Sequence, residues 1–319
     1  MDIRRLAQSL QEETEKIIVG KSDRIRLVIL AALTGGHVLL DDLPGVGKTT
    51  LVKTISRALG CDYGRIQFVP DLLPSDILGM QIYNQKTGDF QLRKGPIMTN
   101  LLLADEINRA IPRTQSALLE AMEEGQISID GEQLALPQPF MVLATQNPVE
   151  SESTFRLPAA QMDRFLLCLS MGYPKPEEER EMLQRLGDEI PFDSVRAVTN
   201  GKELLEARSE ISRVHVSDTV ADYIVALCDG TRNHPSLRLG ASPRGARALY
   251  RASRTLAAME GRDYVTPDDV RTLAHPVLEH RLMLTSGSSF SGVTAAAVLD
   301  ELLETVQAAP AVEAFAHEG

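Results

Sequence analysis

This chain of 319 residues has few cysteines and no long apolar segment. The three cysteines, Cys61, Cys168 and Cys228, lie far apart in the sequence, which indicates reduced thiols in a cytoplasmic protein rather than a disulfide framework. No apolar run approaches the roughly 18 residues that a membrane-spanning helix needs, and charged residues near the N-terminus argue against a secretory signal. The six histidines show no ligand spacing, so the sequence predicts no zinc site.

Basic residues are scarce toward the C-terminus, where no lysine or arginine follows Arg281. The formal net charge is −11 at pH 7. A protein with this balance should not bind nucleic acid non-specifically, because phosphate backbones are held by cations. The length of the chain predicts two domains.

Apolar strands alternate with amphipathic helices over residues 1–173, which predicts an α/β domain with a parallel sheet. From Pro174 the pattern is helical only, so we expect a small all-α domain over 174–308 and a flexible tail over 309–319. Two inserted β-hairpins are predicted over 80–96 and 126–136, the second from the turn signal Asp130-Gly131. The expected sheet strands span 37–41, 65–69, 100–104, 140–144 and 165–170, and the expected helices span 3–18, 25–33, 48–59, 112–124, 176–187, 201–208, 216–229, 243–259, 266–274 and 294–306.

A strand, a loop and a helix over 37–59 form the pattern of a nucleotide-phosphate site. The loop and the first helical turn read Gly45-Val46-Gly47-Lys48-Thr49-Thr50. The two glycines let backbone N–H groups approach phosphate oxygens, and the N-terminus of the helix favours an anion. Lys48 supplies a positive charge to the outer phosphates, and the Thr49 hydroxyl can ligate Mg²⁺.

Asp42 stands where the complete phosphate-loop pattern has a glycine. A carboxylate that faced a triphosphate would repel it. Aspartate tolerates left-handed backbone better than most residues, however, and its side chain can point away. The sequence leaves both orientations open.

Polar side chains follow two further predicted strands. Asp105 and Glu106 end the strand that begins near Asn100, and Asn147 follows the strand over 140–144. Ligands of α/β sheets bind at the carboxyl ends of the strands, so Asp105 can hold the hydration shell of Mg²⁺ and Glu106 can polarise an attacking water. The neutral amide of Asn147 can orient that water or bind the γ-phosphate.

Two arginines are candidates for contacts with phosphate. Arg164 precedes the last predicted strand, where it either pairs locally or reaches the nucleotide of a neighbouring subunit. Arg244 follows the N-cap Ser242 and Pro243 at the start of a helix, where the helix dipole disfavours a cation. A phosphate facing that helix end would resolve the inconsistency.

Taken together, these motifs resemble those of an AAA+ ATPase, and more narrowly those of the MoxR family. The resemblance covers about residues 10–285 and rests on the phosphate loop and on Gly95-Pro96-Ile97, Ala104–Ala110, Thr114–Met122, Ala144–Pro148 and Gln161–Phe165. It implies a P-loop NTPase sheet sandwiched by helices, followed by a small helical lid domain, and Mg²⁺-dependent hydrolysis of ATP.

The resemblance also implies a role for each candidate residue. Lys48 and Thr49 would be the phosphate-loop pair of the Walker A motif, Asp105 and Glu106 the metal-binding and water-activating acids of the Walker B motif, and Asn147 the first sensor. Arg164 would be an arginine finger acting in trans and Arg244 the second sensor in cis, while Val19-Gly20 would line the adenine. Two positions depart from the family: Lys21 stands where glutamine is frequent, and Arg156 where proline is frequent.

Members of the family are typically hexameric and are thought to act as chaperones that mature or activate partners, commonly proteins with a von Willebrand factor A domain. One alternative is a DNA-acting AAA+ motor, because the 80–96 hairpin carries Lys86, Arg93 and Lys94; the 126–136 hairpin has no lysine or arginine. Another is an ATP-binding assembly switch without turnover, against which Glu106 and Arg164 argue.

Overall fold

The computed structural model describes residues 2–42, 45–86, 88–147, 154–187 and 190–307. The chain divides into two compact units, one ending at Ser212 and the other beginning at Arg213. The predicted tail over 309–319 lies outside the described residues.

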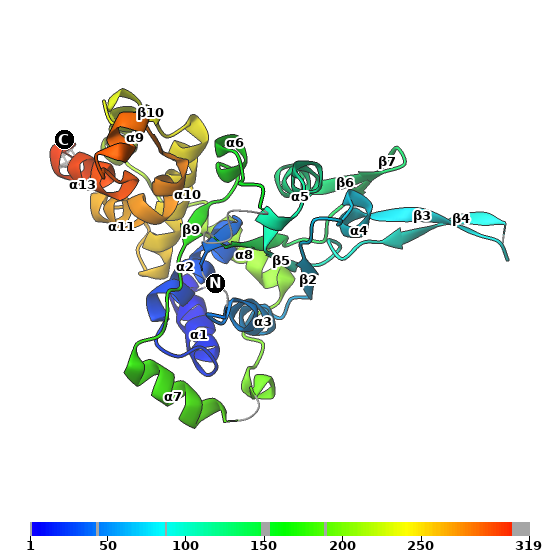
Figure 1. Ribbon diagram of the computed structural model, residues 1–319. Coiled ribbons are helices and arrows are strands. Elements are labelled where there is room, and N and C mark those ends of the chain that lie inside the picture. Colours follow the sequence, from blue (N-terminus) through cyan, green and yellow to red (C-terminus); the bar gives the residue numbers. More distant parts are fainter. Residues whose placement is uncertain (1, 43–44, 87, 148–153, 188–189, 308–319) are drawn as a thin grey trace, which may run out of the picture. The chain divides into compact units, whose positions relative to one another are not determined.

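The first unit is built on a five-stranded sheet in which every strand is parallel to its neighbours (Figure 1). The strand order is β2-β5-β8-β1-β9. The strands are β1 Val38–Asp41, β2 Tyr63–Gln67, β5 Leu101–Asp105, β8 Met141–Gln146 and β9 Leu167–Leu169. The parallel α/β sheet predicted from the alternation of strands and helices is therefore confirmed.

Helices connect and cover these strands. They are α1 Ile3–Glu15, α2 Ser22–Thr34, α3 Lys48–Ala58, α4 Pro74–Leu78, α5 Pro112–Glu124, α6 Ala159–Met162, α7 Pro176–Leu186 and α8 Gly201–Ile211, with 3-10 turns at Ile107–Arg109 and Phe192–Ser194. Helix α5 has the bounds that the sequence predicts, because Pro112 suits a first turn and Gly125 ends the helix with a left-handed φ of 66°. The short helices α4 and α6 were not predicted, since one turn is too short to show a helical period.

Residues 174–212, which the sequence assigned to the helical domain, belong to the first unit. Two contacts explain the difference. The backbone N–H of Val198 donates to the carbonyl oxygen of Ala58 at 2.8 Å, and the guanidinium of Arg208 donates to the carbonyl oxygen of Ala32 at 2.8 Å and 3.1 Å. These bonds tie the segment to the ends of α3 and α2, and no helical period in the sequence could reveal them.

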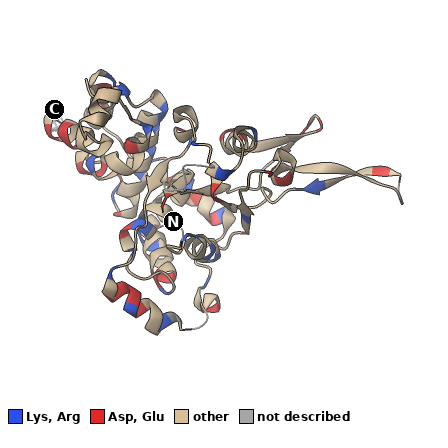
Figure 2. Cartoon of the chain, in the orientation of Figure 1, with Lys and Arg blue, Asp and Glu red and all other residues tan. Residues whose placement is uncertain are grey.

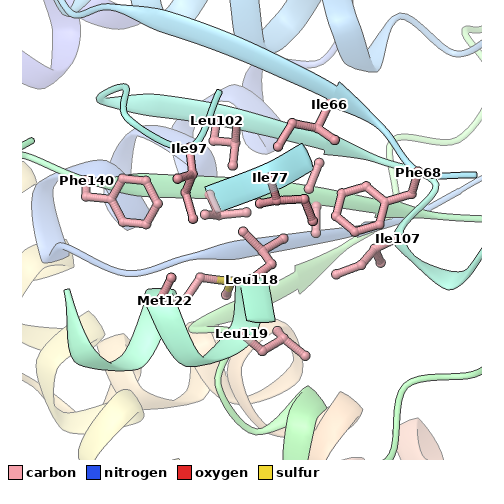
Figure 3. Close-up of a cluster of buried hydrophobic side chains, with 14 of the residues drawn as sticks. Ile66, Phe68, Ile77, Ile97, Leu102, Ile107, Leu118, Leu119, Met122 and Phe140 are labelled. Carbon is pink, nitrogen blue, oxygen red and sulfur yellow. The ribbon is translucent and has the colours of Figure 1, made fainter. Parts of the chain in front are cut away.

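A buried apolar cluster holds the sheet against α5 (Figure 3). Leu102 of β5 and Leu118 of α5 have no exposed surface, and Phe68, just after β2, is also fully buried. The cluster further includes Ile66, Ile77, Ile97, Ile107, Leu119, Met122 and Phe140. This packing fixes the strand ends from which the candidate site is built.

The two predicted hairpins are present in the first unit. Strands β3 Gly79–Asn84 and β4 Asp89–Lys94 pair antiparallel, as do β6 Gln126–Ile129 and β7 Glu132–Ala135. The β3–β4 hairpin extends away from the sheet (Figure 1), and all of β4 is exposed. Figure 2 shows basic residues at both its base and its tip.

The second unit is mainly helical, as predicted. Its helices are α9 Asp218–Asn233, α10 Pro243–Met259, α11 Pro267–Leu278, α12 Ser286–Phe290 and α13 Ala295–Thr305. It also contains a small antiparallel pair, β10 Leu237–Leu239 and β11 Met283–Leu284, which the sequence did not predict because strands of three and two residues carry no alternation. Among the described helices of either unit, none has the length and apolarity to cross a bilayer.

Candidate functional site

Lys48, Asp105, Glu106 and Asn147, predicted site residues of the first unit, lie at the carboxyl edge of the sheet, whereas Arg164 precedes β9 at its amino end. Asp41 at the end of β1 lies opposite Gln146 of β8, and Asp105 at the end of β5 lies opposite Gln67 of β2. The phosphate loop follows β1, and Asn147 follows β8. Parallel pairing therefore brings together segments that are up to about a hundred residues apart in the sequence.

The described part of the phosphate loop has the geometry that its glycines predict. Gly45 and Gly47 both have φ of 84°, and a Cβ added at either would meet no atom of the described residues within 4 Å, chain neighbours aside. Gly47 is the N-cap of α3, and among the described residues no side chain caps this helix. The first N–H groups of α3 are thus available to an anion. Leu43 and Pro44 lie outside the described residues.

Lys48 is buried beside the acidic residues of the site. Its Nζ donates to the backbone carbonyl oxygen of Asp42 at 2.9 Å. Burial lowers the pKa of the Lys48 ammonium, and the carboxylates of Asp42, Asp105, Glu106 and Asp41 oppose that shift. The positive charge therefore interacts with both acids at the end of β5, which suits a shared phosphate and Mg²⁺ site.

The Asp42 carboxylate turns toward the chain that leaves β9. It accepts hydrogen bonds from the backbone N–H of Met171, from the N–H of Gly172 at 3.2 Å and from the Ser170 hydroxyl at 3.2 Å. The residue is 5 % exposed. Its backbone is not left-handed, since among the described residues only Glu106 and Asp130 combine a side chain with a positive φ. The structure thus selects the orientation in which the carboxylate is occupied by protein N–H groups.

The Asp105 carboxylate is held by two neighbouring strands. It accepts a hydrogen bond from the Thr145 hydroxyl at 2.7 Å and pairs with the Arg65 guanidinium at 2.8 Å. The same Thr145 oxygen accepts the backbone N–H of Glu106 at 2.8 Å. Thr145 therefore fixes both predicted acids relative to β8.

Glu106 has a strained backbone and a restrained side chain. Its φ is 57° and its ψ is 49°, a left-handed conformation that is uncommon outside glycine and is often found at functional sites. Its Oε2 accepts hydrogen bonds from Gln67 Nε2 at 2.7 Å and from Arg109 Nη1 at 2.9 Å. The carboxylate is thereby directed along the edge of the sheet.

Three of these partners, Arg65, Gln67 and Thr145, were missed by the sequence analysis. Gln67 ends β2 in register with Asp105, Arg65 lies two residues before it, and Thr145 lies one residue beyond the last residue of β8 that pairs with β5. The polar residues that interrupt these strand ends were a signal, but only the strand order shows which acid each one meets.

Asn147 lies at the same edge and is 6 % exposed. Its backbone carbonyl oxygen accepts a hydrogen bond from Asn108 Nδ2 at 3.2 Å. Asn108 belongs to the turn that follows Glu106, so this bond links the end of β8 to the end of β5. Pro148, the next residue of the motif, lies outside the described residues.

A pocket of about 580 Å³ lies at Gly20, within the first unit. Its lining residues are Gly20, Lys21, Ser22, Asp23, Arg24, Met171, Tyr173, Lys175 and Glu178. Lys21 Nζ donates to the carbonyl oxygen of Tyr173 at 2.9 Å, so the residue that departs from the family joins the two walls of the pocket. Gly20 has φ of 70°, and a Cβ there would overlap the Glu178 side chain. Val19 precedes the pocket and is not among its lining residues.

The two candidate arginines lie in different units. Arg164 pairs with Glu123 of α5 at 3.0 Å, and its side chain is 28 % exposed. Arg244 is exposed in the first turn of α10, where the Ser242 hydroxyl accepts the N–H groups of Arg244 and Gly245 as the predicted N-cap. Arg164 is therefore held within its own subunit by an acidic partner that the sequence did not predict.

The donor set suits Mg²⁺ bound together with phosphates. No group of three or more His, Cys, Asp or Glu within the described parts of the chain could hold a metal ion alone. Thr49 and Asp105 offer one hydroxyl and one carboxylate, which leaves most of an octahedral shell to water and nucleotide oxygens.

Comparisons with known proteins agree with this geometry. The model of the "ATPase family associated with various cellular activities (AAA)" matches residues 37–167, and the model of the "AAA lid domain" matches residues 229–302. These two matches cover the phosphate loop, four of the five strands of the sheet and most of the helical second unit.

Similar proteins match along nearly the whole chain. The uncharacterized protein YeaC of Bacillus subtilis is 47% identical, over 96% of this chain and 96% of its own. Chaperone MoxR1 of Mycobacterium tuberculosis is 42% identical, over 96% and 83%. A crystal structure from Cytophaga hutchinsonii superposes with a TM-score of 0.90 at 37% identity and covers 96% of this chain and 95% of that one.

Proposed function

This chain belongs to the MoxR family of AAA+ ATPases, and from that premise we propose that it hydrolyses ATP in a Mg²⁺-dependent reaction at the carboxyl edge of its sheet. One observation carries the proposal. The buried Lys48, whose Nζ donates to the Asp42 carbonyl oxygen at 2.9 Å, opens a helix behind a glycine loop, at the sheet edge where β5 ends in Asp105 and Glu106.

We assign each residue one part of the reaction. The backbone N–H groups of Gly45–Thr50 bind phosphate oxygens, and Lys48 neutralises charge on the outer phosphates. Thr49 and Asp105 would hold Mg²⁺, which supplies charge neutralisation for phosphoryl transfer. The left-handed backbone of Glu106 places its carboxylate to orient the attacking water, and the Asn147 amide completes that water's orientation.

The pocket at Gly20 is proposed to hold adenine, with Val19-Gly20 as the segment that lines the base. The carboxylate of Asp42 accepts hydrogen bonds from Met171 and Gly172. Because Met171 lines the pocket, these bonds connect the pocket to the start of the phosphate loop. Arg244 is proposed to contact the γ-phosphate in cis as the second sensor.

We further propose that the active unit is a hexameric ring in which Arg164 acts on the nucleotide of the neighbouring subunit. Its partial exposure lets it exchange Glu123 for that phosphate.

The name of the relative MoxR1, a chaperone, supports a role in remodelling, maturing or activating a client protein, for which a von Willebrand factor A domain protein is our candidate. The acidic β6–β7 hairpin, with Asp130 and Glu132 and no basic residue, favours a protein client over DNA.

A cytoplasmic location is proposed because the three cysteines, all of them described, form no disulfide.

Lys48→Ala tests the nucleotide site directly. The variant loses a buried cation that contacts phosphate in the ground state, so its affinity for Mg²⁺-ATP should fall at least tenfold in a calorimetric titration. Lys53→Ala is the matched control, because Lys53 lies on the same helix with its Nζ over the Phe192 ring at 4.1 Å. Equal affinities of the wild type and Lys48→Ala would overturn the assignment of the phosphate site.

A further inference from the structure

Asp42 joins the phosphate lysine to the chain that leaves β9. Its backbone carbonyl oxygen accepts the Lys48 ammonium at 2.9 Å. Its carboxylate accepts the N–H groups of Met171 and Gly172 and the hydroxyl of Ser170. The main-chain carbonyl of Asp42 therefore holds the Lys48 side chain, and its carboxylate holds the distant segment 170–172.

The segment that Asp42 holds also forms a wall of the pocket at Gly20. Met171 and Tyr173 line the pocket, and the carbonyl oxygen of Tyr173 accepts Lys21 Nζ at 2.9 Å. A continuous series of bonds thus runs from Lys48 through Asp42 and residues 171–173 to Lys21, on the opposite wall.

We propose that Asp42 is a positioning residue that couples binding of the base to binding of the phosphates. This inference rests on the proposed function, since it takes the pocket at Gly20 as the base site and the loop at Gly45 as the phosphate site. A base in the pocket orders Met171 and Tyr173. Because Asp42 is hydrogen-bonded to that segment and to Lys48, its backbone and the Lys48 ammonium are then also held in place. The phosphates therefore bind to a loop that is already ordered.

The alternative is a purely structural role, in which Asp42 only satisfies buried N–H groups and shapes the phosphate loop. The two roles differ in which ligands are affected. A coupling residue matters for a ligand that has both a base and phosphates, whereas a loop-shaping residue matters equally for phosphates alone.

The test compares ATP, inorganic triphosphate and adenosine, each with Mg²⁺, as ligands of wild type, Asp42→Asn and Asp42→Ala. Both variants lack the carboxylate that accepts the N–H groups of Met171 and Gly172. We expect the dissociation constant for ATP to rise about tenfold, as for loss of one to two hydrogen bonds to a charged group, and those for inorganic triphosphate and for adenosine to rise less than about threefold. Asp2→Asn is the matched control, because the Asp2 carboxylate also accepts a backbone N–H, that of Arg5 at 3.0 Å, but at the start of α1; its ATP affinity should stay within about threefold of wild type.

A double-variant cycle keeps the test decisive if one variant is unstable. Lys21→Met removes the other end of the same series of bonds. If both residues order residues 171–173, Asp42→Asn combined with Lys21→Met should weaken ATP binding no more than the more damaging single variant does. Additive losses would overturn the coupling.

The remaining outcomes also separate the hypotheses. Equal losses for ATP and triphosphate would mean that Asp42 only shapes the loop, and unchanged affinities would remove any positioning role; both overturn the coupling while ATP binding by the wild type stands. Failure of the wild type to bind ATP would instead overturn the proposed function, and the coupling with it.

Discussion

At the scale of single residues, the hydrogen bonds around Glu106 matter most. Gln67 and Arg109 both donate to its Oε2. Two donors on one oxygen hold the carboxylate in a single orientation.

Gln67→Leu should therefore lower the turnover of a site in which the Glu106 carboxylate must be aimed at water. The loss of one restraining hydrogen bond, about 1 kcal/mol, corresponds to a fall in kcat of up to about fivefold. The dissociation constant for ATP should not change, because Gln67 meets the acid and not the phosphate loop. Steady-state hydrolysis and a binding titration measure the two quantities. An unchanged or raised kcat would show that Gln67 is not needed to aim the carboxylate.

The residues of the site differ in how far the sequence predicts them. Lys48, Thr49, Asp105 and Glu106 follow from local patterns, because a strand end next to a helix start is visible in a short window. The orientation of Asp42 does not, since it depends on N–H groups 129 and 130 residues further along the chain.

At the scale of elements, the β3–β4 hairpin is separate from the core. Tyr83 and Phe90 face each other across the two strands, with ring centroids 5.3 Å apart. They are 53% and 68% exposed. Phe68, in contrast, is fully buried in the cluster between the sheet and α5 (Figure 3).

Truncation of Tyr83 and Phe90 should accordingly lower the free energy of unfolding only slightly. Replacing Tyr83 and Phe90 by serine should lower the free energy of unfolding by less than about 1.5 kcal/mol, whereas Phe68→Ala should lower it by about 3–5 kcal/mol. Urea denaturation followed by circular dichroism compares the three proteins. A loss from the hairpin variant as large as that from Phe68→Ala would mean that the hairpin is part of the folding core.

Most helices and strands could be predicted from the sequence, but their division between the two units could not. Helices α5 and α10 were predicted to the residue because proline, serine and glycine mark their ends. Helix α8 was predicted as a helix but assigned to the wrong side of the unit boundary. Its place depends on the bond from Arg208 to Ala32, a contact between segments that carry no shared pattern.

At the scale of the whole molecule, the pairing of Arg164 with Glu123 bears on assembly. An arginine finger acts on the transition state formed in another subunit. Arg164→Ala should therefore reduce kcat by about 10³-fold or more with little change in ATP affinity, and Glu123→Ala should not reduce it.

Mixed assemblies test whether the site is shared. Arg164→Ala and Glu106→Gln are each expected to be inactive alone, but some interfaces in a mixture pair an intact Glu106 with an intact Arg164. Hydrolysis should reappear when the two proteins are mixed and allowed to exchange subunits. Full activity per subunit in a proven monomer would rule out an action in trans.

Turnover of ATP through Glu106 is tested most directly by single-turnover hydrolysis with enzyme in excess over radiolabelled Mg²⁺-ATP. Glu106→Gln keeps the shape of the side chain and loses the carboxylate, so it should bind ATP with wild-type affinity and release phosphate at least about 100-fold more slowly. Phosphate release by Glu106→Gln at the wild-type rate would contradict the assignment of Glu106 as the residue that activates water.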